Sequence, residues 1–246
     1  MNKLLMALFL CLTFLPAHAV DPDPVKLLKH SDQARGGGLP GLTWEIRSRN
    51  SGSQANEDDP PMRLLIKAVD NSSLAETLEP LRSKGARMLQ VDRNMWLTKP
   101  GLKKPVPISP RQRLTGQAAI GDIAATNYVR DYRPKLLREE PVKGERCFLL
   151  ELTATTKQAT YDRLLYWISA GRGIGIQAEF QSLSGKKMKS AQFEYDNRIE
   201  IQGKTVPFVS RMVISDALTD ARTTLEYSHI VVKPVPASEF DVSHLE

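Results

Sequence analysis

Histidine and cysteine are scarce in this chain, with four histidines and two cysteines among 246 residues. No pair of them has the spacing of a metal site, and no G-x-S-x-G sequence presents a serine nucleophile. A nucleophilic hydrolase needs a serine or cysteine with a base beside it, and the composition offers little choice of base. We therefore expect no catalytic residue, no metal site, no cofactor and no enzymatic activity.

Two weaker catalytic patterns remain open at this point. His229 shares the apolar side of an expected strand and could point inward, where a hydrogen-bonded core histidine is the commoner role. Asp122 and Asp131 could act as paired carboxylates, although turn and cap roles explain them more simply. We expect structural roles for all three.

Long apolar runs are also absent, apart from the first residues. Lys3 precedes an apolar run from Leu4 to Leu15, and an A-x-A sequence follows at Ala17 to Ala19. This pattern is typical of a signal peptide over residues 1–19, because the run is too short to span a bilayer. We expect an exported mature chain that begins at Val20 and contains no transmembrane segment.

Removal of the expected signal peptide also excludes an intramolecular disulfide bond. It removes Cys11 and leaves Cys147, which cannot form an intramolecular disulfide alone. Cys147 lies on an expected strand and is interpreted as a small buried apolar residue. Cys11 follows a leucine, whereas a lipid-modified cysteine needs a small residue before it, so we expect no lipid anchor. The stability of the exported chain must therefore come from its hydrophobic core.

Aromatic residues make up 7% of the chain, and few of them are interleaved with basic residues. Without Lys3 the chain has 33 lysines and arginines against 28 acidic residues, a net charge of +5. The basic residues are scattered over expected strands and turns, so we expect no nucleic-acid partner. A basic outer face meeting an acidic partner or anionic lipid remains an alternative to a merely soluble surface.

One glycine motif, G-x-G-x-G at Gly171, Gly173 and Gly175, has two interpretations. A dinucleotide loop would carry a third glycine three residues after the second and would open a helix, but Ile176 stands there. Apolar and polar residues then alternate up to Gln181, which is the period of a half-buried strand. We therefore interpret the glycines as a hairpin turn.

Strands dominate the rest of the pattern. A short helix is expected first, with Asp23 as its cap, Pro24 at its first position, and Val25 and Leu28 on its apolar side. Strands begin at Thr43, and a second helix is expected from about Asp122 to Val129. Strands then follow one another in a meander with turns between them: Arg133 to Pro141, Glu145 to Ala154, Tyr161 to Ser169, Ile174 to Ser182, Lys187 to Asn197, Thr205 to Ser215 and Arg222 to Lys233. A long sheet with one apolar face must bury that face, so we expect a curled sheet whose concave side is partly covered by the helices.

Three blocks of sequence carry a family resemblance: "RLTGQAAIGDIAATNYVRDYRPKLLREEPVKGERCFLLEL", "LLYWISAGRGIGIQAEFQSLSGKKMKSAQF" and "GKTVPFVSRMVISDALTDARTTLEYSHIVVKPVPASEF". Together with "EPLRSKGARMLQVDRNMWLTKP" before them, they resemble the LolA/LolB-like outer-membrane lipoprotein-sorting family. The resemblance implies a mainly β fold: an open, incomplete antiparallel β-barrel of about eleven strands, with short helices as a lid over a hydrophobic cavity. Residues 20–246 would form that single domain.

The resemblance also implies a function. It indicates a monomeric periplasmic carrier whose cavity binds acyl chains of a lipoprotein or lipid, for transfer towards the outer membrane or a membrane transporter. An inner-membrane exporter of the resistance-nodulation-division type is an expected partner. The family positions acyl cargo with an arginine in the sheet, and no single arginine here can be assigned that role. The alternative is a lipid-sensing or accessory module of an envelope-stress or export system, which the short segment after the last strand favours less.

Alternation along the strands selects the side chains expected to line the cavity. The alternative for each is that it only fills a closed core. The candidate lipid-binding residues are Trp44, Ile46, Leu64, Ile66, Ile176, Phe180, Phe193, Tyr195, Met212, Leu225 and Tyr227.

Overall fold

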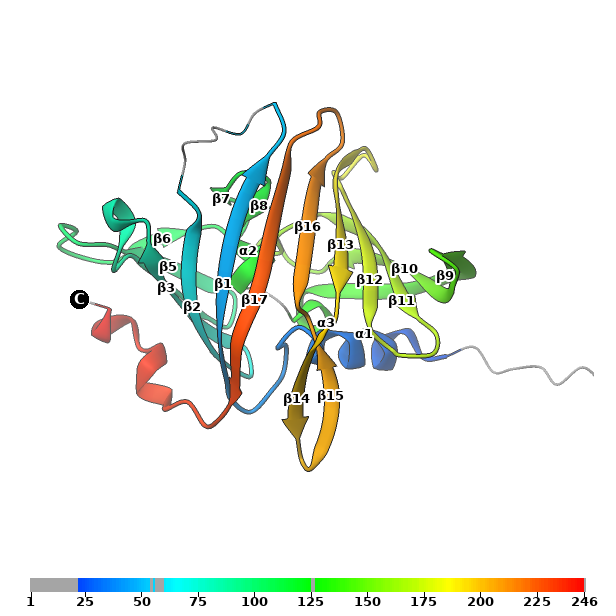
Figure 1. The fold of residues 1–246 in the computed structure, drawn as a ribbon, viewed down its shortest axis with the longest axis horizontal. Helices are drawn as coiled ribbons and strands as arrows, with labels where there is room; N and C mark the ends of the chain where they lie inside the picture. The colour runs from blue at the N-terminus through cyan, green and yellow to red at the C-terminus, as the bar shows by residue number, and fades with distance from the viewer. Residues whose placement is uncertain (1–21, 54, 56–59, 125–126, 246) are drawn as a thin grey trace, which may run out of the picture.

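The computed structural model describes residues 22–53, 55, 60–124 and 127–245, so the expected signal peptide lies outside the described residues. In that part of the chain, thirteen strands form one antiparallel sheet in the order β6-β5-β4-β3-β2-β1-β17-β16-β13-β12-β11-β10-β9 (Figure 1). Their bounds are β1 Leu42–Ser51, β2 Met62–Val69, β3 Ser72–Glu79, β4 Arg87–Val91, β5 Asn94–Thr98, β6 Val106–Ile108, β9 Tyr132–Val142, β10 Glu145–Ala154, β11 Arg163–Ser169, β12 Gly175–Gln181, β13 Lys187–Glu194, β16 Arg211–Asp216 and β17 Arg222–Val232.

The sheet curls but does not close, because β6 and β9 form its two edges and do not pair with each other. The two halves of the chain are joined by β1 and β17, with Ile46 opposite Tyr227 and Ser51 opposite Arg222. The expected open antiparallel β-barrel is thus confirmed. The sheet has thirteen strands where about eleven were expected, and one of them, β6, is a three-residue edge strand with Pro107 at its centre. Such a short strand shows no periodic pattern, and proline is tolerated on an edge.

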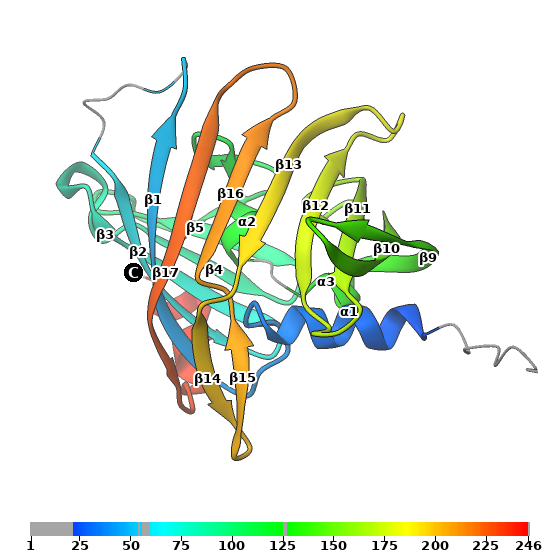
Figure 2. The same cartoon turned by 45° about the vertical axis from the view of Figure 1, so that its right-hand side comes forward.

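The single strand predicted from Thr205 to Ser215 is wrong, because this stretch divides into two strands. Its second half belongs to β16, which pairs with β13 as the meander predicted, with Glu194 opposite Arg211. The residues between them form a separate hairpin of β14 (Asn197–Ile201) and β15 (Lys204–Phe208), which projects from the sheet (Figures 1 and 2). The Asn197 side chain donates to the carbonyls of Val209 and Tyr227, so it holds the crossing where the hairpin leaves. Side-chain hydrogen bonds of this kind between distant segments leave no periodic pattern in the sequence.

Three short helices lie on the concave side of the sheet: α1 (Pro24–Gln33), α2 (Ile120–Ala124) and α3 (Tyr128–Asp131). Figure 2 shows α1 running across the lower opening of the curled sheet, beside α3. Asp23 caps α1 as expected, since its carboxylate accepts from the backbone N–H of Val25 at 2.9 Å. The expected apolar side of α1 is confirmed for Leu28, which is buried, and wrong for Val25, which is exposed; the helix also buries the polar residues Ser31 and Asp32. The face of α1 that meets the interior is therefore largely polar.

The single helix expected from Asp122 to Val129 is two helices, α2 and α3. Residues 125–126 of that prediction lie outside the described residues. A small hairpin of β7 (Arg113–Thr115) and β8 (Ala118–Ala119) precedes α2, and the Asp122 carboxylate accepts from the Ala119 backbone N–H at 2.8 Å. Every residue of α2 is buried. In the described residues, no helix is long and apolar enough to cross a membrane.

The outer face of the sheet is covered in one place by the C-terminal segment. Two single-turn helices, Ala237–Phe240 and Val242–His244, follow β17, and a third, Leu81–Ser83, follows β3. Phe240 and Leu245 pack on Leu74 and Leu89 in a cluster separate from the concave interior. The C-terminal segment thus buries apolar surface on the face opposite the helices.

Gly171 and Gly173 lie in the turn between β11 and β12, as the hairpin interpretation predicted, and Gly175 is the first residue of β12. Gly173 has φ of +68°, and a Cβ there would lie 2.4 Å from His30 of α1. A Cβ on Gly175 would lie 1.8 Å from the Tyr166 hydroxyl, which shares a 2.9 Å hydrogen bond with Ser31 of α1. Both glycines therefore leave space in which α1 docks onto the sheet.

Replacing Gly175 with alanine should destabilise the protein by about 1–3 kcal/mol, since the new methyl group forces Tyr166 away from Ser31. Gly171→Ala is the matched control, because nothing lies within 4 Å of its added Cβ. Urea unfolding of the two variants measures the difference. Equal stability of both variants would show that the Tyr166 contact does not constrain this position.

One hydrophobic cluster contacts strands from both halves of the sheet, and we propose from it that residues 20–246 fold as a single domain. We expect one cooperative urea transition, coincident when followed by tryptophan fluorescence and by circular dichroism at the strand band. Two separated transitions would contradict a single domain.

Candidate ligand-binding site

The eleven side chains predicted to line the cavity are all buried in one hydrophobic cluster on the concave side. They come from six strands and from the link that follows β13, and none of them is more than 9% exposed. Because water reaches so little of their surface, these side chains pack against other protein atoms. Any ligand longer than a few atoms would have to displace the helices that cover them.

These side chains are Trp44 and Ile46 on β1, Leu64 and Ile66 on β2, Ile176 and Phe180 on β12, Phe193 on β13, Tyr195 after β13, Met212 on β16, and Leu225 and Tyr227 on β17.

Arg35 is the one arginine that the described residues bury almost completely, at 2% exposure. It follows α1 directly, and its guanidinium carbon lies 4.6 Å from the Tyr128 ring centre and 4.9 Å from that of Phe193. Its two terminal nitrogens have no hydrogen-bond partner among the described residues. Sequence reasoning assigned no role to this arginine. A basic residue at a helix C-terminus usually interacts there with exposed carbonyls, and only the packing shows that this one points inward.

Four tyrosine hydroxyls surround the Arg35 guanidinium closely enough to interact with its charge: Tyr128, Tyr166, Tyr195 and Tyr227. Tyr195 donates to the Gly175 carbonyl at 2.6 Å, whereas the Tyr128 hydroxyl has no partner in the described part of the chain. Burial raises the pKa of Tyr227 to about 12 and raises the pKa values of the other three as well. All four hydroxyls are therefore protonated and able to donate at neutral pH.

Asp32 lies one helical turn before Arg35 and is equally buried. Its Oδ2 accepts from the backbone N–H of Val129 at 2.8 Å, which ties α1 to α3, and its Oδ1 has no partner among the described residues. Asp32 and Arg35 form no ion pair with each other in this structure. Burial raises the pKa of Asp32 to about 7, although the Val129 hydrogen bond and the charge of Arg35 lower it.

A second polar cluster fixes α2. The Tyr161 hydroxyl donates to the Asp122 carboxylate at 2.8 Å, and Lys189 Nζ lies 3.6 Å from the same carboxylate. The lysine also lies 5.0 Å from the Tyr161 ring centre, and that ring stacks on Phe180 at 4.1 Å. This cluster is internally satisfied, so it anchors α2 rather than offering groups to a ligand.

The other residues considered for catalysis have structural positions. Asp131 pairs with Arg93 and Arg130, so it and Asp122 belong to separate clusters. His229 points outward, because a bulge in β17 gives it φ of +51° and turns its side chain to the solvent. No group of three or more His, Cys, Asp or Glu side chains in the described residues could hold a metal ion.

Cys147 on β10 is buried, as its sequence position predicted. Its thiol donates to the Glu145 carbonyl at 3.3 Å, and burial raises its pKa. A protonated buried thiol is a poor nucleophile, which fits a packing role.

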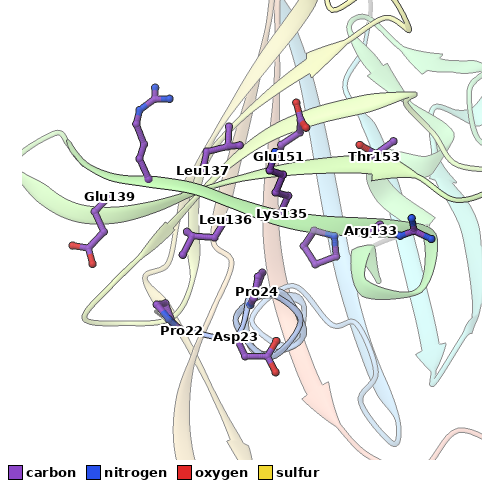
Figure 3. A pocket seen from close by; sticks show the side chains of 12 residues that line it. Pro22, Asp23, Pro24, Arg133, Lys135, Leu136, Leu137, Glu139, Glu151 and Thr153 are labelled. Carbon is purple, nitrogen blue, oxygen red and sulfur yellow. The ribbon is translucent and has the colours of Figure 1, made fainter. Parts of the chain in front are cut away.

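Two hollows open on the surface near α1. The larger, of about 800 Å³, lies between the start of α1 and β9, and Figure 3 shows Leu136 of β9 directed towards Pro22 with charged side chains of β9 and β10 around it. The second, of about 330 Å³, lies between α1 and the β14–β15 hairpin and is lined by apolar residues such as Leu39, Ile174 and Val206. None of the eleven predicted residues lines either hollow.

The raised pKa of Asp32 makes stability depend on pH. Its carboxyl binds a proton more tightly in the folded chain, with a pKa of about 7 against 3.8 for the ordinary value, so the folded state loses stability as pH rises through this window. Between pH 3.8 and about 7 the ionisation of Asp32 should lower the free energy of unfolding by up to about 4 kcal/mol. Asp32→Asn, which keeps an acceptor for Val129, should flatten the decline and stabilise the protein at pH 8.

Urea unfolding at pH 4.5, 6 and 8 measures this effect as the difference between wild type and variant. Asp70→Asn is the control, because Asp70 is exposed and has φ of +47°, which asparagine tolerates. An unchanged pH profile in Asp32→Asn would assign the decline to other groups.

Comparison with known proteins agrees with this architecture. A family model described as uncharacterized protein matches residues 69–246, and no curated protein matches the chain. A LolA superfamily protein from Nitrosomonas europaea is 30% identical with a TM-score of 0.78, over 89% of this chain and 97% of its own. A domain described as an outer membrane lipoprotein-sorting protein from Vibrio parahaemolyticus is 18% identical with a TM-score of 0.76, over 90% and 97% of the two chains. A DUF1329 family protein from Desulfovibrio piger, 20% identical, has a TM-score of 0.74 over 92% of this chain and 100% of its own. The fold and the 30% identity over nearly the whole length show that this chain belongs to the LolA superfamily.

Proposed function

We propose that the protein is a periplasmic carrier that binds acyl chains of a lipoprotein or lipid beneath α1 and α3. It would release them towards the outer membrane or a membrane transporter. The observation that carries the proposal is the continuous apolar concave face, which short helices cover while the edge strands β6 and β9 of the described sheet stay unpaired with each other. The eleven buried residues named above are its proposed contacts. The expected exporter of the resistance-nodulation-division type and the monomeric state belong to the same proposal.

The cover is weak enough to move. Helix α1 has ten residues but only one fully buried apolar side chain, Leu28, whose burial is worth about 2 kcal/mol. Its remaining buried residues, Ser31 and Asp32, make polar contacts that water can replace once the helix lifts. By contrast α2 is buried along its whole length. We therefore propose that α1 and α3 open while α2 stays on the sheet.

The energetics of acyl binding fit such a cover. Each buried methylene contributes roughly 0.8 kcal/mol, so a sixteen-carbon chain gains on the order of 10 kcal/mol before ordering costs. This exceeds the cost of lifting one weakly held helix. Contacts to the chain itself would be non-directional, so it could pass to a more apolar acceptor.

Titration with the neutral sixteen-carbon alcohol 1-hexadecanol, in competition with the fluorescent probe N-phenyl-1-naphthylamine, tests acyl binding. The delipidated wild-type protein should bind both. Phe180→Asp should weaken binding by about tenfold or more, because a charge in contact with an acyl chain costs more than 1.4 kcal/mol. Leu183→Asp, at an exposed position beyond the end of the same strand, is the matched control and should bind as the wild type does.

A second measurement does not depend on whether Phe180→Asp folds. Hydrogen exchange of the α1 amides in the wild type should accelerate when 1-hexadecanol binds, since the helix must leave its place. Failure of the wild type to bind either compound, or binding with α1 equally protected, would show that this interior is only a closed core.

A further inference from the structure

Arg35 places a positive charge inside the buried interior, and the binding of an acyl chain alone does not explain this charge. A buried guanidinium without partners costs several kcal/mol relative to an exposed one. The local chain nevertheless directs Arg35 inward. Backbone N–H groups of Arg35 and Gly37 both bond to the Asp32 carbonyl at 2.9 Å, and Gly36 follows with φ of +95°. The turn that ends α1 therefore holds this side chain against the sheet.

The surroundings of Arg35 contain unused donors. Its two terminal nitrogens and the Tyr128 hydroxyl make no hydrogen bond of normal geometry among the described residues, and the groups closest to the guanidinium there are the neutral hydroxyls of Tyr128 and Tyr166. The rings of Tyr128 and Phe193 pack against the guanidinium and limit where it can turn. Asp32, one helical turn before Arg35, accepts from Val129 and makes no ion pair with the guanidinium. The group that this arrangement lacks is an acceptor that carries negative charge.

The chemistry of the donors narrows that acceptor. A guanidinium presents a planar pair of N–H groups that matches a carboxylate or a phosphate, and a tyrosine hydroxyl can add a third hydrogen bond. Tyr227, whose hydroxyl lies 3.9 Å from the Met212 sulfur, and Phe193 connect this site to the apolar cluster on the concave side, so the anion would have to be joined to an apolar tail. A free inorganic anion would bind the guanidinium but would have no apolar part to contact that cluster.

We infer that Arg35 and the Tyr128 hydroxyl bind the anionic group of an acyl amphiphile, a carboxylate or a phosphate, with the head group held inside beneath α1 and the tail along the sheet. This rests on the proposed function and specifies its ligand class. The head group supplies the directional contact that the acyl chain lacks. It also gives the guanidinium the partners it lacks in the closed state, so ligand entry and α1 movement become coupled.

Three sixteen-carbon probes of equal tail length test the assignment: palmitate, hexadecyl phosphate and 1-hexadecanol. The wild type should bind at least one of the two anions about tenfold or more tightly than the alcohol, the gain typical of charge-assisted hydrogen bonds. Arg35→Met should abolish the preference and keep the affinity for 1-hexadecanol. Arg35→Lys should show an intermediate preference, because the charge remains and the paired geometry is lost. Whichever anion is preferred identifies a fatty acid or a phospholipid as the source.

Arg146→Met is the matched control, since the Arg146 side chain is 73% exposed, and it should leave all three affinities unchanged. Arg35→Met should be at least as stable as the wild type without ligand, because it removes a buried unpaired charge and keeps an apolar stem. A wild type that binds 1-hexadecanol but shows no preference for either anion would overturn this inference alone. So would an Arg35→Met variant that keeps the preference. Absence of binding to any probe would overturn the proposed function, and the inference with it.

Discussion

The pairing of β1 with β17 is the interaction on which the rest of the structure depends. It joins strands separated by most of the chain and makes one sheet of two meanders, which the order of strands along the chain could not do alone. Strands twist, and a sheet of this width curls, so the apolar sides of both halves face one interior. Because the edge strands β6 and β9 stay unpaired with each other, the curl leaves an opening that α1, α2 and α3 cover. The position of α1 and α3, and everything they enclose, follows from that incomplete closure.

The cover of this interior combines weak apolar contact with specific polar contact. Leu28 provides most of the apolar attachment of α1, while Ser31 and Asp32 bind Tyr166 and Val129. Polar contacts between buried groups are geometrically demanding, so they place the helix accurately without adding much net stability. Gly173 and Gly175 serve the same docking, since side chains there would occupy the places of His30 and Tyr166. Such a cover can lift and return to one position.

The inward arginine gives this cover a second property. A charge without partners destabilises the closed state, and a ligand that supplies an acceptor removes that penalty in the bound state. The difference between the two states then favours binding of ligands with an anionic group over ligands that have only a tail. The same side chain follows directly on the helix that we propose to move, so the proposed selectivity and opening lie in one short segment of the chain. This arrangement is consistent with membership of the LolA superfamily and refines what the interior is proposed to bind.

Local patterns in the sequence determined much of the fold. Alternation identified the inward sides of the strands, including all eleven side chains now found in one cluster, and the failed dinucleotide pattern identified the turn at Gly171 to Gly175. The cap of α1 at Asp23 was predictable because it depends on neighbouring residues. The tertiary structure alone decided that the expected strand from Thr205 to Ser215 divides into β15 and β16 and that His229 turns outward, since a bulge or a crossing breaks the period without a sequence signal. Above all it decided the burial of Arg35, because whether a charged side chain at a helix end meets water or the core depends on which distant strands pack against it.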